Sequence, residues 1–265
     1  MVAIFDPDRA SGGSMTRFKG LNAHGSYTKA ALPRGHLAST EARTVYPKSV
    51  IDAAKSPRLL VSGHNNIKLG AKITRGAWAG MPIFQLTLEE RATCPQTCHV
   101  WAACYGNAMP FARRHRDDGT LVARLSQELQ ALSAKHDRFA VRLHVLGDFF
   151  SEDYAHAWLD FLYQHKGLHI WGYTAWPYGS AIAELVSGMN QLCPDRCVIR
   201  FSQRVGTSVY PSASTMWGDV QGPGILCPQS DDKTHCCGTC GMCWADALKA
   251  TPIVFKGHGT GGKHE

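Results

Sequence analysis

Ten of the 265 residues are cysteines, and their spacing is typical of metal ligands rather than of disulfide partners. They form three groups in the sequence. These groups are Cys94, Cys98 and Cys104; Cys193 and Cys197; and Cys227, Cys236, Cys237, Cys240 and Cys243. In the last group a thiol recurs at every third residue from Cys237 to Cys243, with a glycine in each gap. Such runs, completed by one remote cysteine, are typical ligands of four-iron iron–sulfur clusters.

The C-terminal group predicts a closed cluster. Cys227 is the remote ligand that we expect beside the run. Adjacent cysteines rarely both reach one cluster, and Cys237 fits the spacing better than Cys236. The predicted ligands are therefore Cys227, Cys237, Cys240 and Cys243. Four thiolates saturate the cluster and restrict it to electron transfer, sensing or structural support.

The first group predicts a more reactive site. With three thiolates, from Cys94, Cys98 and Cys104, one iron of a four-iron cluster stays open to a ligand that accepts an electron. A single cluster is an alternative, in which these cysteines are completed by one from the C-terminal group. Zinc is a second alternative, because four thiolates also suit zinc. Clustered triplets of cysteines favour iron–sulfur over zinc.

Two observations disfavour disulfides and a membrane location. The N-terminal residues lack the basic start, apolar core and cleavage site of a signal peptide, and no apolar run approaches the ~18 residues of a membrane span. We therefore expect a cytoplasmic protein with reduced cysteines. Cys193 and Cys197 flank a Pro-Asp-Arg sequence at the start of a predicted strand, and we predict that they are small buried hydrophobic side chains.

The net charge of +7 is concentrated in the N-terminal part of the chain. Residues 1–75 contain 12 Lys and Arg against 4 Asp and Glu, a balance of +8, and the remainder carries −1. We predict a basic, extended arm over residues 1–58, which either contacts nucleic acid or only keeps the chain in solution. The second alternative is favoured, because few aromatic residues interleave with the charges. The other predicted divisions are an α/β core at 59–222, a cysteine-rich segment at 223–246 and a tail at 247–265.

Strands and helices alternate through the core. Short strands are predicted between Leu59 and Leu88, broken by glycines, and the last of them leads into the Cys94 loop. Apolar residues at helical spacing then predict three helices, each followed by a buried strand. The helices are expected at 119–135, after Ser151 and after Ser180, and the strands at 140–146, 168–174 and 197–202. This order indicates a parallel sheet with right-handed crossovers, hence an α/β fold that is either an open sheet or a partial barrel.

Polar residues follow the predicted strands at their C-terminal ends, where α/β folds place their chemistry. Asp148, Thr174 and Arg204 occupy these positions, and the Cys94 loop also follows a strand. We expect them to face one rim and to act as catalytic residues on a small polar cofactor or substrate. Alternatively, Asp148 caps a helix, Thr174 satisfies a strand end and Arg204 pairs with a surface carboxylate.

Several of these motifs resemble the bacteriophage "gene product 88" family. The motifs are Lys68-Leu69-Gly70, the loop from Cys94 to Tyr105, Arg142 to Trp158, Trp171 to Thr174, and Cys227 to Trp244. The resemblance spans roughly residues 66–245. It implies a phage-encoded protein that works in a bacterial cytoplasm, and it implies no particular biochemical role.

A more distant similarity is to radical S-adenosylmethionine (SAM) enzymes. In their pattern, a Cys-x3-Cys-x2-Cys loop leaves one iron open for SAM, and a Gly-Glu pair receives the SAM amino group. Here the loop is Cys-x3-Cys-x5-Cys, and Gly147-Asp148 takes the place of Gly-Glu. The similarity implies SAM as a ligand at the first cysteine group, with Asp148 as a SAM-binding residue. The hypotheses are thus a radical-SAM-like enzyme, a nucleic-acid-binding protein with a structural cluster or zinc, and an electron-transfer protein.

Overall fold

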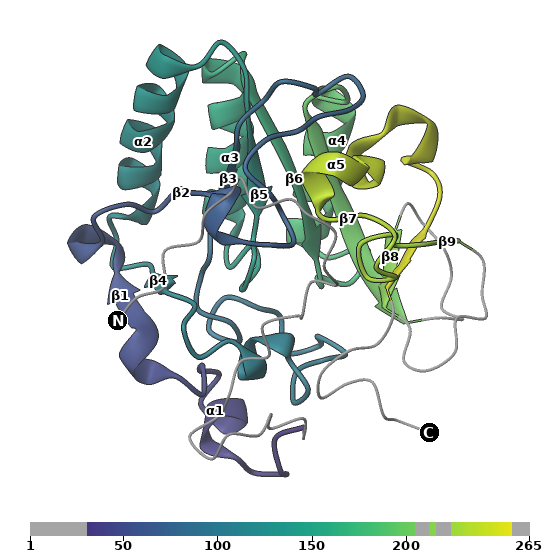
Figure 1. The fold of residues 1–265 in the computed structure, drawn as a ribbon. Coiled ribbons are helices and arrows are strands. Elements are labelled where there is room, and N and C mark those ends of the chain that lie inside the picture. Colours follow the sequence, from purple (N-terminus) through teal and green to yellow (C-terminus); the bar gives the residue numbers. More distant parts are fainter. Residues whose placement is uncertain (1–30, 205–211, 216–223, 256–265) are drawn as a thin grey trace, which may run out of the picture.

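An eight-stranded sheet forms the centre of the molecule (Figure 1). The computed structural model describes residues 31–204, 212–215 and 224–255. The strand order is β2-β3-β5-β6-β7-β8-β10-β9, and each neighbouring pair is parallel except β2 with β3. The strands are β2 (Val61–Ser62), β3 (Ile83–Gln85), β5 (Phe139–Leu143), β6 (Leu168–Thr174), β7 (Cys197–Arg204), β8 (Ser212–Thr215), β9 (Ile225–Leu226) and β10 (Ile253–Phe255). A separate parallel pair consists of β1 (Val50–Asp52) and β4 (Arg114–Arg116).

Three long helices cover one face of this sheet: α2 (Leu121–Lys135), α3 (Glu152–Gln164) and α4 (Ala181–Leu192). Because β3, β5, β6 and β7 follow one another in one direction across the sheet, right-handed crossovers place their connecting helices on the same side. The structure confirms the α/β class and its parallel strands. Of the two predicted arrangements, the sheet is open, with β2 and β9 at its edges. Among the described helices, none combines the length and the apolar character that a membrane span requires.

Local sequence determines where two of these helices begin. Ser151 caps α3, since its Oγ accepts a hydrogen bond from the backbone N of Tyr154 at 3.1 Å. Ser180 caps α4 in the same way and accepts from the N of Ala183. Each serine follows a strand end, so each cap also fixes a loop at the rim of the sheet.

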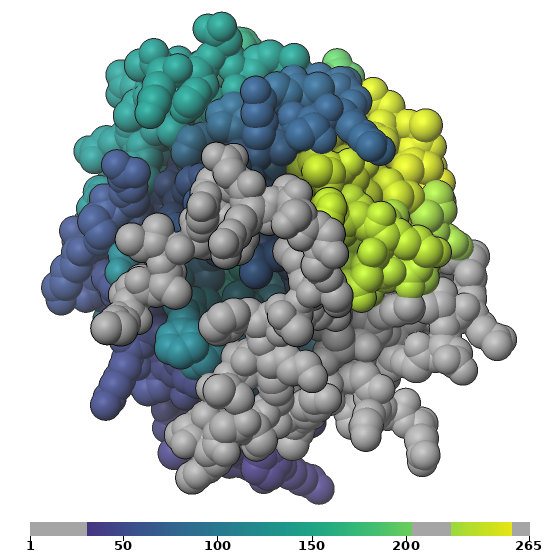
Figure 2. Space-filling view, in the orientation of Figure 1, coloured from purple at the N-terminus to yellow at the C-terminus, as the bar shows by residue number. Residues whose placement is uncertain are grey.

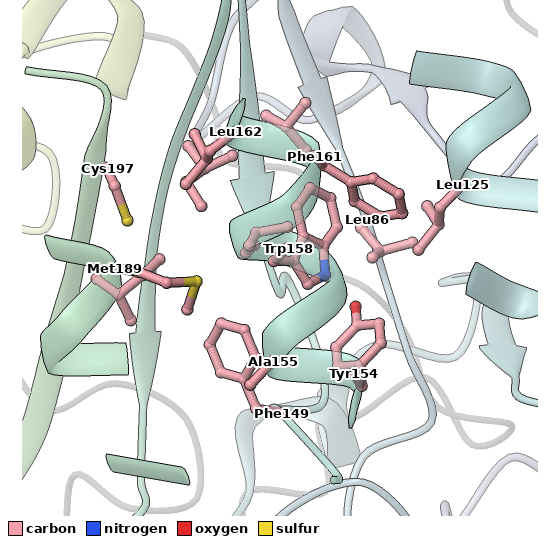
Figure 3. Packing of buried hydrophobic residues seen from close by; sticks show 14 of the residues in the cluster. Leu86, Leu125, Phe149, Tyr154, Ala155, Trp158, Phe161, Leu162, Met189 and Cys197 are labelled. Atoms are coloured by element: carbon pink, nitrogen blue, oxygen red, sulfur yellow. The ribbon is translucent and has the colours of Figure 1, made fainter. Parts of the chain in front are cut away.

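The helix-side core packs large apolar side chains between α2, α3, α4 and the sheet (Figure 3). Trp158 of α3 is completely buried and meets the rings of Tyr154 and Phe161 edge-on, at centroid distances of 6.3 and 5.5 Å. Cys193 and Cys197 belong to this core, which confirms that they are small buried side chains.

A second core, rich in tryptophan, lies on the opposite face, because alternate side chains of a strand point to opposite sides. Trp78 stacks on Trp244 at a centroid distance of 5.4 Å, and Trp171 of β6 lies 4.8 Å from Trp244. Cys227 and Cys243 are buried in this core. The C-terminal segment, yellow in Figure 2, lies there beside the blue segment that precedes β3.

The region before β3 differs from the prediction. The sequence predicts several strands between Leu59 and Leu88, but residues 66–74 form turns and one isolated bridge. Part of their backbone bonds to the C-terminal segment: the N of Cys237 donates to the carbonyl of Lys68 at 2.7 Å. This partner lies far away in the sequence, so short-range alternation does not reveal it.

Candidate metal centres

The first three cysteines lie on the loop that follows β3, at the C-terminal ends of the parallel strands. Cys94 lies within electrostatic range of Cys98, Cys104 and Asp148. The three predicted ligands of the open site thus lie in one region of the fold, within electrostatic range of the predicted carboxylate, and their role as ligands stays a prediction. Burial raises the pKa of Cys104 to about 12. Burial and the charge of Asp148 raise the pKa of Cys94 well above its usual value.

Asp148 connects the ends of β5 and β6. Its Oδ1 accepts a hydrogen bond from the N of Phe149 at 2.8 Å, and its Oδ2 accepts one from the N of Ala175 at 2.7 Å. The Thr174 side chain also bonds to this carboxylate. Burial raises the pKa of Asp148 to about 7, because the hydrogen bonds offset only part of the desolvation. Asp148 and Thr174 thus meet at one rim, and Ser151, rather than Asp148, caps the next helix.

Gly147 brings Asp148 against the cysteine loop. Its backbone is left-handed, with φ 84°, and a side-chain carbon at this position would lie 2.5 Å from Oγ1 of Thr93. Glycine is the residue that tolerates both conditions. The N of Asp148 donates to the same Oγ1 at 3.1 Å, which fixes the turn to the start of the loop.

Arg204 is the last residue of β7, so its backbone reaches the same edge of the sheet as Thr174 at the end of β6. The side chain of Arg204 lies outside the described residues. The catalytic roles of Asp148, Thr174 and Arg204 stay predictions.

Arg91 holds the cysteine loop from within. Its backbone is left-handed, with φ 65°, and only 2% of the residue is exposed. The guanidinium donates to the carbonyls of Trp101 and Arg43 at 3.0 and 3.2 Å, and to Oδ1 of Asn107 at 2.6 Å. Arg200 of β7 holds the C-terminal segment similarly, through the carbonyls of residues 248 and 251. The sequence does not reveal the roles of these two arginines, because no local pattern distinguishes a buried arginine from an exposed one.

A buried ion pair supports the same loop. Nε of Arg114 lies 2.6 Å from Oε2 of Glu90, and both side chains are almost fully buried. The hydroxyl of Thr44 donates to the other oxygen of Glu90 at 2.7 Å, and the hydroxyl of Tyr46 donates to a loop carbonyl at 2.5 Å. Thr44 and Tyr46 belong to the predicted basic arm, so this part of the arm supports the loop.

Four cysteines line a cavity beside the tryptophan-rich core. The lining residues are Cys227, Pro228, Gln229, Cys237, Cys240, Gly241, Met242, Cys243, Trp244 and Ile253. The cysteines in this set are the four that the spacing predicts as ligands of the closed cluster. Burial raises the pKa of Cys243 to about 11, and it also raises those of Cys237 and Cys240. These thiols stay protonated near neutral pH unless a metal displaces their protons.

Two glycines allow the short helix α5 (Cys237–Cys240) to present its sulfurs to the cavity. Gly241 ends the helix in the left-handed conformation, with φ 73°, and its N donates to the carbonyl of Cys237 at 2.9 Å. The chain thereby turns back, so that Cys243 reaches the same cavity. Gly238 packs closely on residues 66–74. A side-chain carbon at position 238 would lie 2.3 Å from the carbonyl oxygen of Lys72.

Cys236 has a different position. It is the N-cap residue of α5, with its sulfur 3.6 Å from the hydroxyl of Thr239. The sulfur also packs on Gly70, where a side-chain carbon would lie 2.6 Å from it. Cys236 is not part of the cavity lining, whereas Cys237 is, and the choice of Cys237 as the ligand stays a prediction.

Both donor sets suit iron–sulfur centres in their chemistry. One consists of four thiols around a cavity, and the other of three thiols beside a carboxylate. Among the described residues, no three His, Cys, Asp or Glu side chains are arranged to hold a single metal ion.

The part of the chain that contains the first cysteine group and strands β2 to β7 matches a family model. The model for "Gene product 88" matches residues 58–208, which is more than half of the chain. The chain belongs to the gene product 88 family. The match supports the prediction that this gene product 88 protein is encoded by a phage. The matched residues end before Cys227, whereas the motifs that resemble the family in the sequence extend to about residue 245. Neither curated proteins nor solved structures match the chain, and the similarity to radical SAM enzymes stays a hypothesis.

Proposed function

We propose that this gene product 88 protein holds two four-iron iron–sulfur clusters, one closed and one open. The observation that carries the proposal is the composition of the cavity. Its lining includes the four cysteines selected by their spacing and leaves out the adjacent Cys236. The presence of the remote Cys227 in the same lining as this run supports the closed cluster. The closed cluster would be bound by Cys227, Cys237, Cys240 and Cys243.

The chain itself prepares the cavity for a cluster. Burial keeps the thiols protonated, so binding must release protons and is coupled to the folding of the surrounding segment. The backbone of α5 bonds to residues 68–74, and Trp244 packs on Trp78, so the ligands sit on a rigid support. A closed cluster on such a support is suited to electron transfer.

Cys94, Cys98 and Cys104 would hold the open cluster. Such a cluster, when bound, supplies an iron that takes a small ligand, together with one-electron chemistry. The chain places Asp148 beside these thiols and holds its carboxylate in a fixed orientation through Phe149 and Ala175. A fixed carboxylate suits a ligand with an ammonium group, and SAM is the first ligand of this kind to test. On this basis we propose a radical-SAM-like reaction on a substrate that is not identified.

Electron transfer alone is the second candidate function, and the set of four thiols around one cavity favours it, because four thiolates would leave no iron open to a ligand. A protein of this kind would have a reversible cluster potential and no response to SAM. A nucleic-acid-binding protein with a structural zinc or cluster would instead bind nucleic acid with a steep dependence on salt.

Anaerobic preparation followed by counting of iron, acid-labile sulfide and zinc tests the proposal. Two four-iron clusters predict about eight iron and eight sulfide per chain. Cys237→Ser and Cys98→Ser should each remove about half of both. Cys236→Ser is the matched control, because it changes the adjacent cysteine outside the cavity lining and should leave the iron content unchanged. One equivalent of zinc without sulfide would contradict the proposal.

A further inference from the structure

The phenol of Tyr173 contacts one of the predicted cluster ligands. Tyr173 lies on β6, and its hydroxyl is 2.9 Å from the sulfur of Cys243. In the free thiol form, either atom is able to donate the hydrogen. Once Cys243 is a metal-bound thiolate it has no hydrogen, and Tyr173 is then the donor of the pair.

Arg142 lies on the ring of this tyrosine. Its guanidinium carbon is 4.7 Å from the centre of the Tyr173 ring. Arg142 belongs to β5 and pairs in register with Trp171 of the neighbouring β6, two residues before Tyr173. A cation over an aromatic ring withdraws electron density from it and makes a phenol hydroxyl a stronger donor. The charge also lies within electrostatic range of Cys237 and Cys243.

We propose that Tyr173, polarised by Arg142, donates a hydrogen bond to the Cys243 thiolate and thereby raises the reduction potential of the centre held by the C-terminal cysteines. The inference rests on the proposed function, since it needs a redox-active cluster in the cavity. A reduced cluster carries one more negative charge than an oxidised one. A donor and a cation next to a ligand sulfur therefore stabilise the reduced form more than the oxidised form. Arg142 acts partly through Tyr173, as a positioning residue.

Tyr173→Phe is the most direct test, because it removes the hydroxyl and keeps the ring. Reductive titration of the anaerobically purified full chain, followed by paramagnetic resonance, gives the potential of each centre. We expect the variant to keep its iron and to have a C-terminal centre about tenfold harder to reduce, a shift of ~59 mV to lower potential for one electron. The matched control is Tyr154→Phe, which removes a buried hydroxyl 3.0 Å from Nε2 of His144, in the helix-side core, and should leave this potential unchanged.

Arg142→Gln tests the inference independently of the hydroxyl. The C-terminal centre should again shift to lower potential, because a nearby positive charge is lost. Arg138→Gln is the control, since Arg138 immediately precedes the same strand at its opposite end and donates to the carbonyl of Ala77. Unchanged potentials in both Tyr173→Phe and Arg142→Gln, at full iron and sulfide content, would overturn the inference. Absence of iron and sulfide from the unmodified protein would instead contradict the proposed function.

Discussion

Arg200 donates a hydrogen bond from Nε to the carbonyl oxygen of Cys243, at 2.9 Å. Its two other guanidinium nitrogens donate to the carbonyls of Leu248 and Thr251 at 2.9 and 3.0 Å. Arg200 lies in β7 and is 1% exposed. The sheet therefore determines where its three guanidinium nitrogens lie. One side chain thus attaches the segment that carries most of the C-terminal cysteines to the centre of the fold.

Replacement of this arginine should detach the segment. We expect Arg200→Gln to lower the free energy of unfolding by roughly 3 kcal/mol, because buried carbonyls lose their donors. The proposed closed centre should be affected most, since Cys243 is one of its proposed ligands. Denaturant unfolding, combined with iron counting on the folded protein, measures both effects.

Arg196→Gln provides the matched control. Nη1 of Arg196 also donates to three carbonyls, those of Leu162, His165 and Leu168. These carbonyls belong to α3, to its C-cap residue and to the start of β6, and none of these residues lines the cysteine cavity. Arg196→Gln should destabilise the fold and keep its iron, so equal loss of iron from both variants would contradict the anchoring role of Arg200.

The fold was predictable where its signals are local. Periodic leucines give α2, and the sequence Ser151-Glu152-Asp153 gives the start of α3, because apolar spacing and capping act within a few residues. The turns within residues 66–74 were not predictable, because the backbone of Lys68, Leu69 and Thr74 bonds to α5, more than 160 residues later in the chain. The alternation of residue types predicts strands there, because a local pattern contains no information about a distant backbone partner.

Some features of the candidate site were also predictable from local sequence, and others were not. The four cysteines of the cavity follow from a spacing of three residues and one remote cysteine, and this pattern also separates Cys237 from Cys236. The contact between Tyr173 and Cys243 joins residues 70 positions apart. The spacing in the sequence therefore predicts which cysteines lie together, whereas a contact such as that between Tyr173 and Cys243 is visible only in the fold.

Gly241 should be difficult to replace, because its φ of 73° is unfavourable for a residue with a side chain. We expect Gly241→Ala to cost about 1 kcal/mol of stability and to weaken cluster binding, since Cys240 and Cys243 lie on either side of the turn. Gly188→Ala is the control: Gly188 lies within α4, and a side-chain carbon there meets nothing within 4 Å. That change should stabilise the protein by up to about 1 kcal/mol. Equal effects of the two changes on stability and iron would exclude a special role for the turn.

The buried His115 should make the protein sensitive to acid. Its Nδ1 has no hydrogen-bond partner among the described residues, and burial lowers its pKa to about 4. Unfolding returns this pKa to near 6.5, so between these values the unfolded state binds more protons, and stability falls as the pH is lowered. His115 should contribute about 3 kcal/mol of stability above pH 6.5 that is lost on approaching pH 4. The free energies of unfolding of the unmodified protein and of His115→Gln should become more similar as the pH falls over this range. If the two free energies depend on pH in the same way, His115 is not the group responsible.

Asp148 and the open cysteine site provide the test of the proposed reaction. If an iron next to Cys94 takes SAM, adding SAM to the reduced protein should change the paramagnetic resonance spectrum, and a competent enzyme should release 5′-deoxyadenosine. Asp148→Asn should weaken this response at least several-fold, because the carboxylate that offsets the ammonium charge of the ligand is lost. Asp160→Asn, which changes an exposed carboxylate on α3, should respond like the unmodified protein. If both clusters are intact and the spectrum does not respond to SAM, the radical-SAM-like reaction is excluded and electron transfer becomes the function that the two centres support.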